Sequence, residues 1–168
     1  MNFELKTLSS EAVPRALAKA ERYRLLNEPG EAASICLDAL EVDPDNQEAL
    51  ITLLLALTDQ FDNHAAAAVT EAAECATRIR SDYDRAYYTG IIWERRAKAQ
   101  LQRGAPNCGP RAFEWLREAM NWFEKAEAIR PAGNDDAVLR WNTCVRFLER
   151  HNELTPSAVE VAEPILSE

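Results

Sequence analysis

The side chains that most often do proton chemistry are scarce in this sequence. His64 and His151 are its only histidines, and neither accompanies a nucleophile and a carboxylate in a recognisable catalytic pattern. His64 falls in a stretch with the composition of a turn and His151 at the end of a helical stretch, which favours solvent-exposed or helix-capping roles. The phosphate-binding loop, the zinc-protease helix motif and the nucleophile elbow of hydrolases are all absent from the sequence. The sequence therefore predicts no enzymatic activity.

The cysteines are widely spaced, and none forms the Cys-x-x-Cys pair that is typical of zinc sites and redox motifs. They are Cys36, Cys75, Cys108 and Cys144. We expect reduced thiols buried on helices, with no disulfide, no metal and no cofactor, as is typical of a reducing compartment. The chain does not begin with a signal-like segment, and its longest apolar run, residues 53–57, is too short to span a bilayer. These features predict a cytoplasmic protein without a membrane partner.

The charge of the chain argues against a nucleic-acid partner. The formal net charge is −9, whereas Lys and Arg supply most of the non-specific affinity for phosphate backbones. The charge is uneven, because residues 61–110 hold 7 Lys and Arg against 6 Asp and Glu, while both flanking parts are clearly acidic. The arginines of this middle part are the best candidates for contacts with an acidic partner.

The spacing of apolar residues predicts an all-α fold. Apolar residues recur at every third or fourth position, glycine is rare, and no run alternates as a strand does. We expect helices over residues 10–26, 31–42, 47–60, 65–80, 84–103, 111–130 and 134–150. Turns at 27–30, 43–46 and 61–64 and a longer loop at 104–110 are expected between them, because these stretches are rich in Pro, Gly, Asn and Asp.

One stretch combines helix, turn and stop signals in a specific order. Tyr23 precedes the turn at residues 27–30, alanines follow on the second helix, and Pro44 ends the unit. The second half of this pattern returns at Ala119, Phe123, Ala126 and Pro131. The order resembles the tetratricopeptide repeat (TPR), a two-helix unit that must stack on its neighbours to bury its apolar face.

The resemblance implies a right-handed solenoid of helical hairpins over residues 1–150. Three TPR-like pairs would occupy about residues 11–46, 47–82 and 83–133, and residues 134–150 would form a capping helix. Gly90 is similar to the small residue that this family places where two helices cross closely. Residues 151–168 are acidic and are expected to form a flexible tail. The apolar positions of the tail that could dock on the domain are Val159, Val161, Ile165 and Leu166.

In the TPR family the first helix of each pair lines a concave groove that holds a peptide or a helix. The resemblance places in this groove Leu17, Glu21, Arg24, Ile51, Thr52, Leu55, Asp59, Tyr87, Tyr88, Ile91, Arg95, Asn142 and Arg146. Tyr87, Tyr88, Arg95 and Arg146 are expected to contribute most to binding, whereas Leu55 and Ile91 suit core packing almost equally well. The clamp with which one TPR subgroup holds chaperone tails is missing from these positions. The function predicted from the resemblance is non-catalytic binding of a protein or peptide.

The aromatic residues of the C-terminal half allow a second interpretation. They are Trp93, Phe113, Trp115, Trp122, Phe123, Trp141 and Phe147. Their helical spacing is typical of a packed core, although Trp115 and Trp122 share one helix face and one of them can be partly exposed. The alternative function is therefore self-association through this half, as a structural homo-oligomer with an empty groove. The two functions differ in a simple observable, since self-association makes the molecular mass depend on concentration.

Overall fold

The structure, a computed structural model, describes residues 3–104 and 108–156, apart from the side chains of residues 63–65. The described residues form helices and no strand, so the all-α fold class is confirmed. A short 3₁₀ turn, η1 (Ser10–Ala12), precedes α1 (Val13–Leu25), α2 (Pro29–Val42), α3 (Gln47–Thr58), α4 (Phe61–Thr77), α5 (Asp82–Gln102), α6 (Cys108–Ala128) and α7 (Asp136–Arg150).

Local side chains fix several helix ends. Asn27 follows α1 with a φ of 61°, a left-handed conformation that Asn tolerates better than most residues and that ends a helix. The side-chain oxygen of Asn46 accepts a hydrogen bond from the Ala49 amide at 2.9 Å, and Ser81 does the same for the Asp84 amide at 3.1 Å. These two N-caps satisfy amides that would otherwise lack a partner at the start of α3 and α5.

Three predicted connections are shorter in the structure. Pro29 and Gly30 belong to the first turn of α2, and Cys108–Pro110 belong to the first turn of α6, where the missing amide of a proline costs nothing. The turn predicted at residues 61–64 is wrong, because α4 begins at Phe61. The ring of Phe61 is 2% exposed, and its burial outweighs the turn preference of the polar residues that follow. Residues 105–107 of the predicted loop lie outside the described residues.

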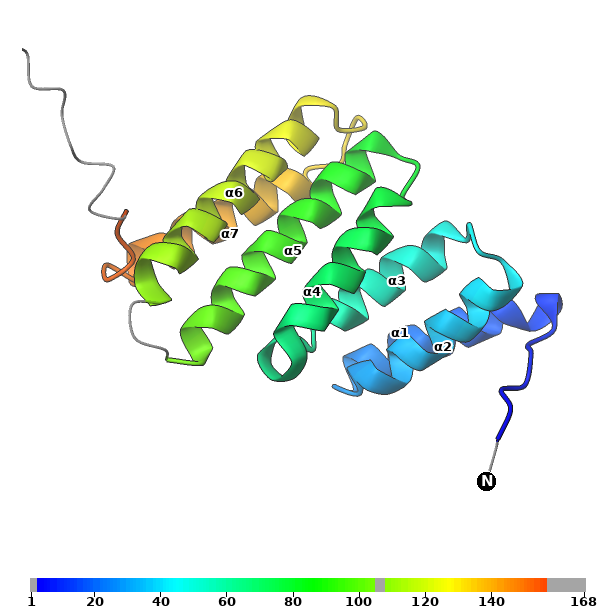
Figure 1. Cartoon of the computed structure of the whole chain (residues 1–168). Helices are drawn as coiled ribbons and strands as arrows, with labels where there is room; N and C mark the ends of the chain where they lie inside the picture. Colours follow the sequence, from blue (N-terminus) through cyan, green and yellow to red (C-terminus); the bar gives the residue numbers. More distant parts are fainter. Residues whose placement is uncertain (1–2, 105–107, 157–168) are drawn as a thin grey trace, which may run out of the picture.

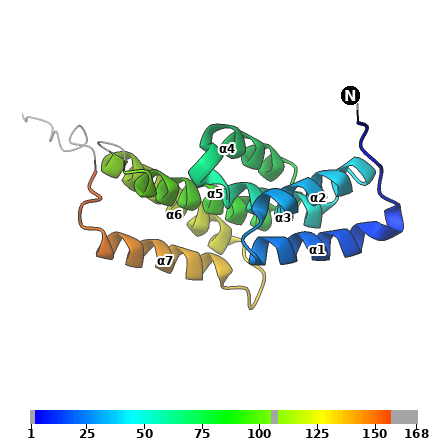
Figure 2. The ribbon, with the colours of Figure 1, turned by 90° about the horizontal axis from the view of Figure 1, so that it is seen from below.

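Each helix packs mainly on the helix before it and the helix after it in the chain. Contacts also join α1 to α3 and α3 to α5, which form a second layer of neighbours. The helices consequently lie side by side in nearly sequential order (Figure 1). Seen from below, α1 and α7 lie on the same side of α3 and α5 (Figure 2).

The core consists of a large apolar cluster over α1 to α4 that also takes in residues of α5, a second cluster over α5 to α7, and a small third one between α5, α6 and α7. The helices α5 and α6 cross closely, because a Cβ atom at Gly90 would lie only 2.5 Å from Cε1 of Phe123. The small residue predicted at a tight crossing is confirmed at this position.

The predicted tail begins later than residue 151. Leu154 is 6% exposed and belongs to the second core cluster, and the carbonyl oxygen of Glu153 lies 3.3 Å from where a Cβ atom at Gly109 would be. The chain after α7 therefore packs on the start of α6 before it reaches Pro156. Residues 157–168, with the four apolar positions named for docking, lie outside the described residues.

Candidate functional site

A polar cleft lies between α1, α3, α5 and α7. It has a volume of about 530 Å³ and is bordered by the ends of α1 and α3, the start of α4, the second half of α5, and α7. We call it the charged cleft, because its lining includes Arg24, Asp59, Asp62, Glu94, Arg95, Lys98 and Arg140. Residues from four separate parts of the sequence thus meet at one site.

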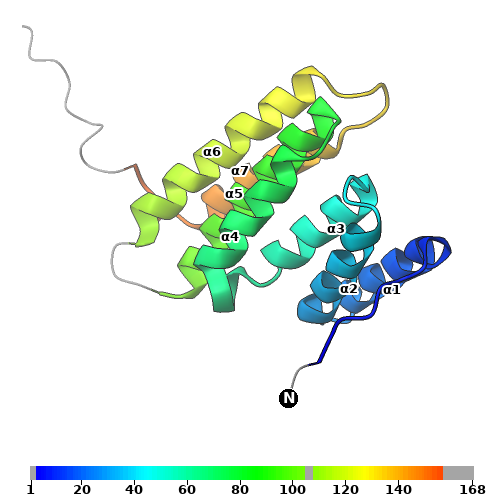
Figure 3. The same ribbon diagram turned by 45° about the vertical axis from the view of Figure 1, so that its right-hand side comes forward.

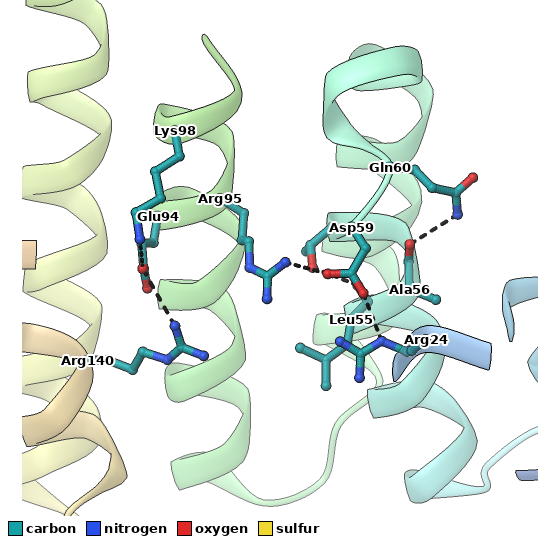
Figure 4. A network of polar contacts seen from close by, with 10 residues as sticks. Arg24, Leu55, Ala56, Asp59, Gln60, Glu94, Arg95, Lys98 and Arg140 are labelled. Carbon is teal, nitrogen blue, oxygen red and sulfur yellow. Dashed lines mark hydrogen bonds and ion pairs between the residues drawn. The ribbon is translucent and has the colours of Figure 1, made fainter. Parts of the chain in front are cut away.

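Asp59 follows the last residue of α3 and holds two arginines from different helices. Its Oδ2 accepts a hydrogen bond from Nε of Arg24 on α1 at 2.9 Å, and its Oδ1 accepts one from Nη1 of Arg95 on α5 (Figure 4). The three side chains are between 19% and 32% exposed, so water screens these ion pairs less than it screens pairs on an open surface. One carboxylate therefore links α1, α3 and α5.

Glu94 is the buried acid of the site, with 1% of its side chain exposed. Its Oε1 accepts a hydrogen bond from Nζ of Lys98, one turn later in α5, and lies 3.6 Å from Nη1 of Arg140 on α7 (Figure 4). Its Oε2 is buried and has no hydrogen-bond partner among the described residues. A carboxylate is stable in such a place only beside compensating charge, so Glu94 holds α7 against α5 through the two cations.

Positive charge dominates the cleft although the chain is acidic. Four cationic side chains face three acidic ones, whereas the whole chain has a formal charge of −9. Burial alone would lower the pKa of Arg140. Interaction with Tyr87 and with the carboxylate of Glu94 outweighs burial, so that the pKa of Arg140 is raised. Because Asp59 and Glu94 are each shared by two cations, the guanidinium groups keep donors for a further anion. The arrangement is suited to binding a carboxylate.

Three of the predicted groove residues meet at this cleft, namely Arg24, Asp59 and Arg95. Other predicted residues lie on the same helices beside it and are half-buried: Ile51, Thr52 and Leu55 of α3. Glu21 of α1 is exposed. Three residues predicted from the sequence thus lie together at the charged cleft, and three more lie on α3 beside it.

Tyr87 and Tyr88 of α5 are half-buried members of an aromatic cluster. Their ring centroids are 5.1 Å apart in an edge-to-face arrangement, and the ring of Tyr87 lies 6.0 Å from that of Phe123. Burial raises the pKa of Tyr88 to about 12. Both tyrosines therefore support the packing of α5, and only their exposed parts are open to a partner.

Two of the predicted residues belong to the core, and two others lie on α7 outside the charged cleft. Leu17 and Ile91 are 2% and 1% exposed, so they belong to the core and are closed to a partner. Asn142 and Arg146 each lie two positions along the helix from the buried Cys144. Successive helical residues are rotated by about 100°, so both lie on the side of α7 opposite to Cys144. The contribution of α7 to the cleft comes from Arg140 instead.

Sequence reasoning missed Glu94, Lys98 and Arg140. A signal for Glu94 was present, since it lies three residues after Ile91 and three before Ala97, both of which are buried. A single acid on the apolar stripe of a helix indicates a buried charge that needs partners. Lys98 lies four residues after Glu94, the spacing of an ion pair within a helix. The role of Arg140 can be recognised only from the packing of α7.

The other reactive side chains are those of the histidines and cysteines. Within residues 3–104 and 108–156 no cluster of three or more His, Cys, Asp or Glu is placed to hold a metal ion. His151 lies at the end of α7 with Nδ1 2.8 Å from Oε1 of Glu153, and the side chain of His64 is not described. Burial raises the pKa of the buried thiols, to about 12 for Cys36 and Cys144 and about 11 for Cys75.

Models of protein families give no match to this chain, and a search of curated proteins likewise gives none. None of the helices in the described part of the chain is sufficiently long and apolar to cross a membrane.

Proposed function

We propose that this chain is a non-catalytic, TPR-like interaction module whose charged cleft binds an acidic segment of a partner protein. The observation that carries the proposal is the sharing of Asp59 and Glu94 between two cations each, at a cleft that four parts of the chain build. Such a site presents guanidinium donors in fixed positions, which lowers the entropy cost of holding a carboxylate.

The arrangement of the helices supports a solenoid of three pairs with α7 as the closing helix. Packing passes from each helix to the next, and the first helices of successive pairs, α1, α3 and α5, also touch one another. The glycine at the crossing of α5 and α6 agrees with the TPR pattern. In such an array the first helices face the concave side, and the charged cleft is lined by residues at the ends of α1 and α3 and in the second half of α5.

The border of the cleft indicates more about the partner segment. Leu25 lines the cleft and is 83% exposed, an unusual exposure for a large apolar side chain next to charged ones. A partner that places a carboxylate at Arg95 and Arg24 can pack an apolar side chain on Leu25. The proposed ligand is therefore a short segment that carries both an acidic and an apolar residue.

Self-association is the second candidate, because the C-terminal half exposes two large aliphatic side chains. Ile129, directly after α6, is 52% exposed and Leu139 of α7 is 62% exposed. Light scattering over a range of protein concentrations separates the two functions. A constant monomer mass contradicts self-association, and a mass that rises to that of a dimer supports it.

Affinity capture with matched variants tests the main proposal. The variant Arg24→Gln/Arg95→Gln removes two cations of the cleft and keeps an amide that can donate to Asp59. The control Arg22→Gln/Arg117→Gln removes two exposed cations that do not line the cleft. We expect a set of proteins from a native lysate that the wild type and the control capture and that the cleft variant does not. Identical captured sets for all three chains would contradict the proposal.

A further inference from the structure

A second groove lies on the other side of α5, between α4 and α6. Two cavities of about 410 and 730 Å³ share Val69 and Arg96 in their linings and so lie next to each other; we call the two together the α4–α6 groove. Its floor is made by positions of α5, such as Ile92 and Arg96, that point away from those lining the charged cleft. In Figures 1 and 3 this face is the one from which α4, α5 and α6 are all visible.

The walls of the α4–α6 groove are aromatic and aliphatic. Trp115 and Trp122 line it from α6, and both are half-buried, as their shared helix face predicted. Ile129 continues the same wall and is 52% exposed. Val69 contributes from α4 and Trp93 from the floor. An apolar surface of this kind, open to water, is typical of a docking site.

Cations line the floor of the α4–α6 groove along one face of α5. Arg85 donates a hydrogen bond to the Ile79 carbonyl at 2.7 Å, and Arg103 donates one to the Phe61 carbonyl. Arg96 lies between them and makes no hydrogen bond or ion pair within the described residues. Its guanidinium stacks on the tryptophan wall, 4.0 Å from the centroid of the Trp115 ring, and burial together with Arg111 lowers its pKa. A carboxylate beside Arg96 would compensate this partly desolvated charge.

The described chain ends at a different face of α6 from the one that lines this groove. After α7 the chain returns to α6 (Figure 2). Pro156 borders a shallow depression there together with Phe113 and Arg117. Residues 157–168 follow, and they contain three glutamates, four large apolar residues and no Lys or Arg. Twelve residues span up to about 40 Å, whereas a helix with its side chains is about 10–12 Å across. The segment is thus long enough to pass around α6 and reach Arg96.

We propose that residues 157–168 dock in the α4–α6 groove of their own chain, with apolar side chains on Trp115 and Trp122 and a glutamate on Arg96. The charges of the segment and of the groove floor are complementary, and the segment supplies the aliphatic side chains that an aromatic wall can bury. Docking covers the apolar groove and leaves the charged cleft on the opposite side of α5 open.

Acrylamide quenching of tryptophan fluorescence in the full-length chain tests this docking. Three of the four tryptophans line the groove, so their access to the quencher reports its occupation. We expect increased quenching for the tail variant Glu160→Lys/Glu163→Lys and for the groove variant Arg96→Glu. The combined variant restores the charge pairing, and its quenching is expected to return toward the wild-type value. Arg22→Glu, an exposed substitution on α1, is the matched control and should leave the quenching unchanged.

Three results would overturn the proposal. Equal quenching of the wild type and the tail variant would show that the segment does not cover the tryptophans. An effect that depends on protein concentration would assign the groove to a second copy. Increased quenching with Arg95→Glu and not with Arg96→Glu would place the segment in the charged cleft. If circular dichroism shows that Arg96→Glu does not fold, the tail variant and Val161→Asp/Ile165→Asp decide the matter, since both lie outside the described helices.

Discussion

The aromatic ring of Phe123 lies where a side chain at Gly90 would begin. A Cβ atom at position 90 would be 2.5 to 3.0 Å from three ring carbons, and the ring itself is fully buried. The backbone of α5 therefore approaches α6 more closely than any larger residue allows. This contact sets the position of the second half of α5, which carries Glu94 and Arg95 into the charged cleft.

The close crossing predicts that Gly90→Ala destabilises the protein. Alanine favours a helix over glycine by about 1 kcal/mol, but overpacking a core costs about 1–3 kcal/mol, so we expect a net loss of up to about 2 kcal/mol. Urea unfolding measures the loss as a lower midpoint. The control is Gly30→Ala in α2, where an added Cβ atom meets nothing within 4 Å, and it should be neutral or stabilising. A Gly90→Ala variant as stable as the control would contradict the crossing.

Glu94→Gln is expected to destabilise the packing of α7 on α5. The substitution leaves Lys98 and Arg140 without their shared carboxylate, and the loss of charged hydrogen bonds of this kind costs about 1–3 kcal/mol. The measurement is urea unfolding, with Glu114→Gln on the exposed side of α6 as a matched control. Combination with Arg140→Gln should give a smaller loss than the sum of the single variants. Additive effects would show that the two residues do not interact.

The cysteines should differ sharply in reactivity. Cys36, Cys75 and Cys144 are at most 5% exposed and their pKa values are raised by burial, whereas Cys108 at the start of α6 is half-buried. Because the thiolate is the reactive form, a thiol reagent at pH 8 should modify Cys108 rapidly in the folded chain and the other three only in urea. Cys108→Ser should abolish the rapid phase. Rapid modification of two or more thiols would contradict the described core.

The buried thiols also predict a loss of stability in alkali. In the unfolded chain thiols lose their protons near their ordinary pKa of about 9, whereas Cys36 and Cys144 keep theirs to about pH 12 in the folded chain. The folded state then binds more protons above pH 9, so the free energy of unfolding falls as the pH rises. Each thiol contributes up to about 1.4 kcal/mol per pH unit. Urea unfolding between pH 8 and 11 should show a shallower fall for Cys144→Ala; an unchanged slope would contradict the buried thiol.

The sequence predicted the helical framework well, because its signals are local. The proline after α2 and the apolar periodicity each depend on a few neighbouring residues. The predicted start of α4 was wrong because it depends on a distant contact. Phe61 is held in the core by residues from other helices, and the sequence around Asp62 and Asn63 contains no local signal of that contact.

The site was predicted in part for a similar physical reason. Arg24, Asp59 and Arg95 followed from the expected faces of α1, α3 and α5. The role of Glu94 depends on its burial, and that of Arg140 on the direction from which α7 packs, which the repeat pattern did not specify. Asn142 and Arg146 were assigned to the groove from the resemblance, and the α7 residue that lines the charged cleft is Arg140.

The affinity of one captured partner for the wild type and the cleft variant tests the central claim most directly. Titration at low and physiological salt should give at least about a tenfold weaker Kd for Arg24→Gln/Arg95→Gln, equivalent to about 1.4 kcal/mol, and a weaker dependence on salt than the wild type shows. The control Arg22→Gln/Arg117→Gln should bind as the wild type does. Equal affinities of the wild type and the cleft variant at both salt concentrations would contradict binding at the charged cleft.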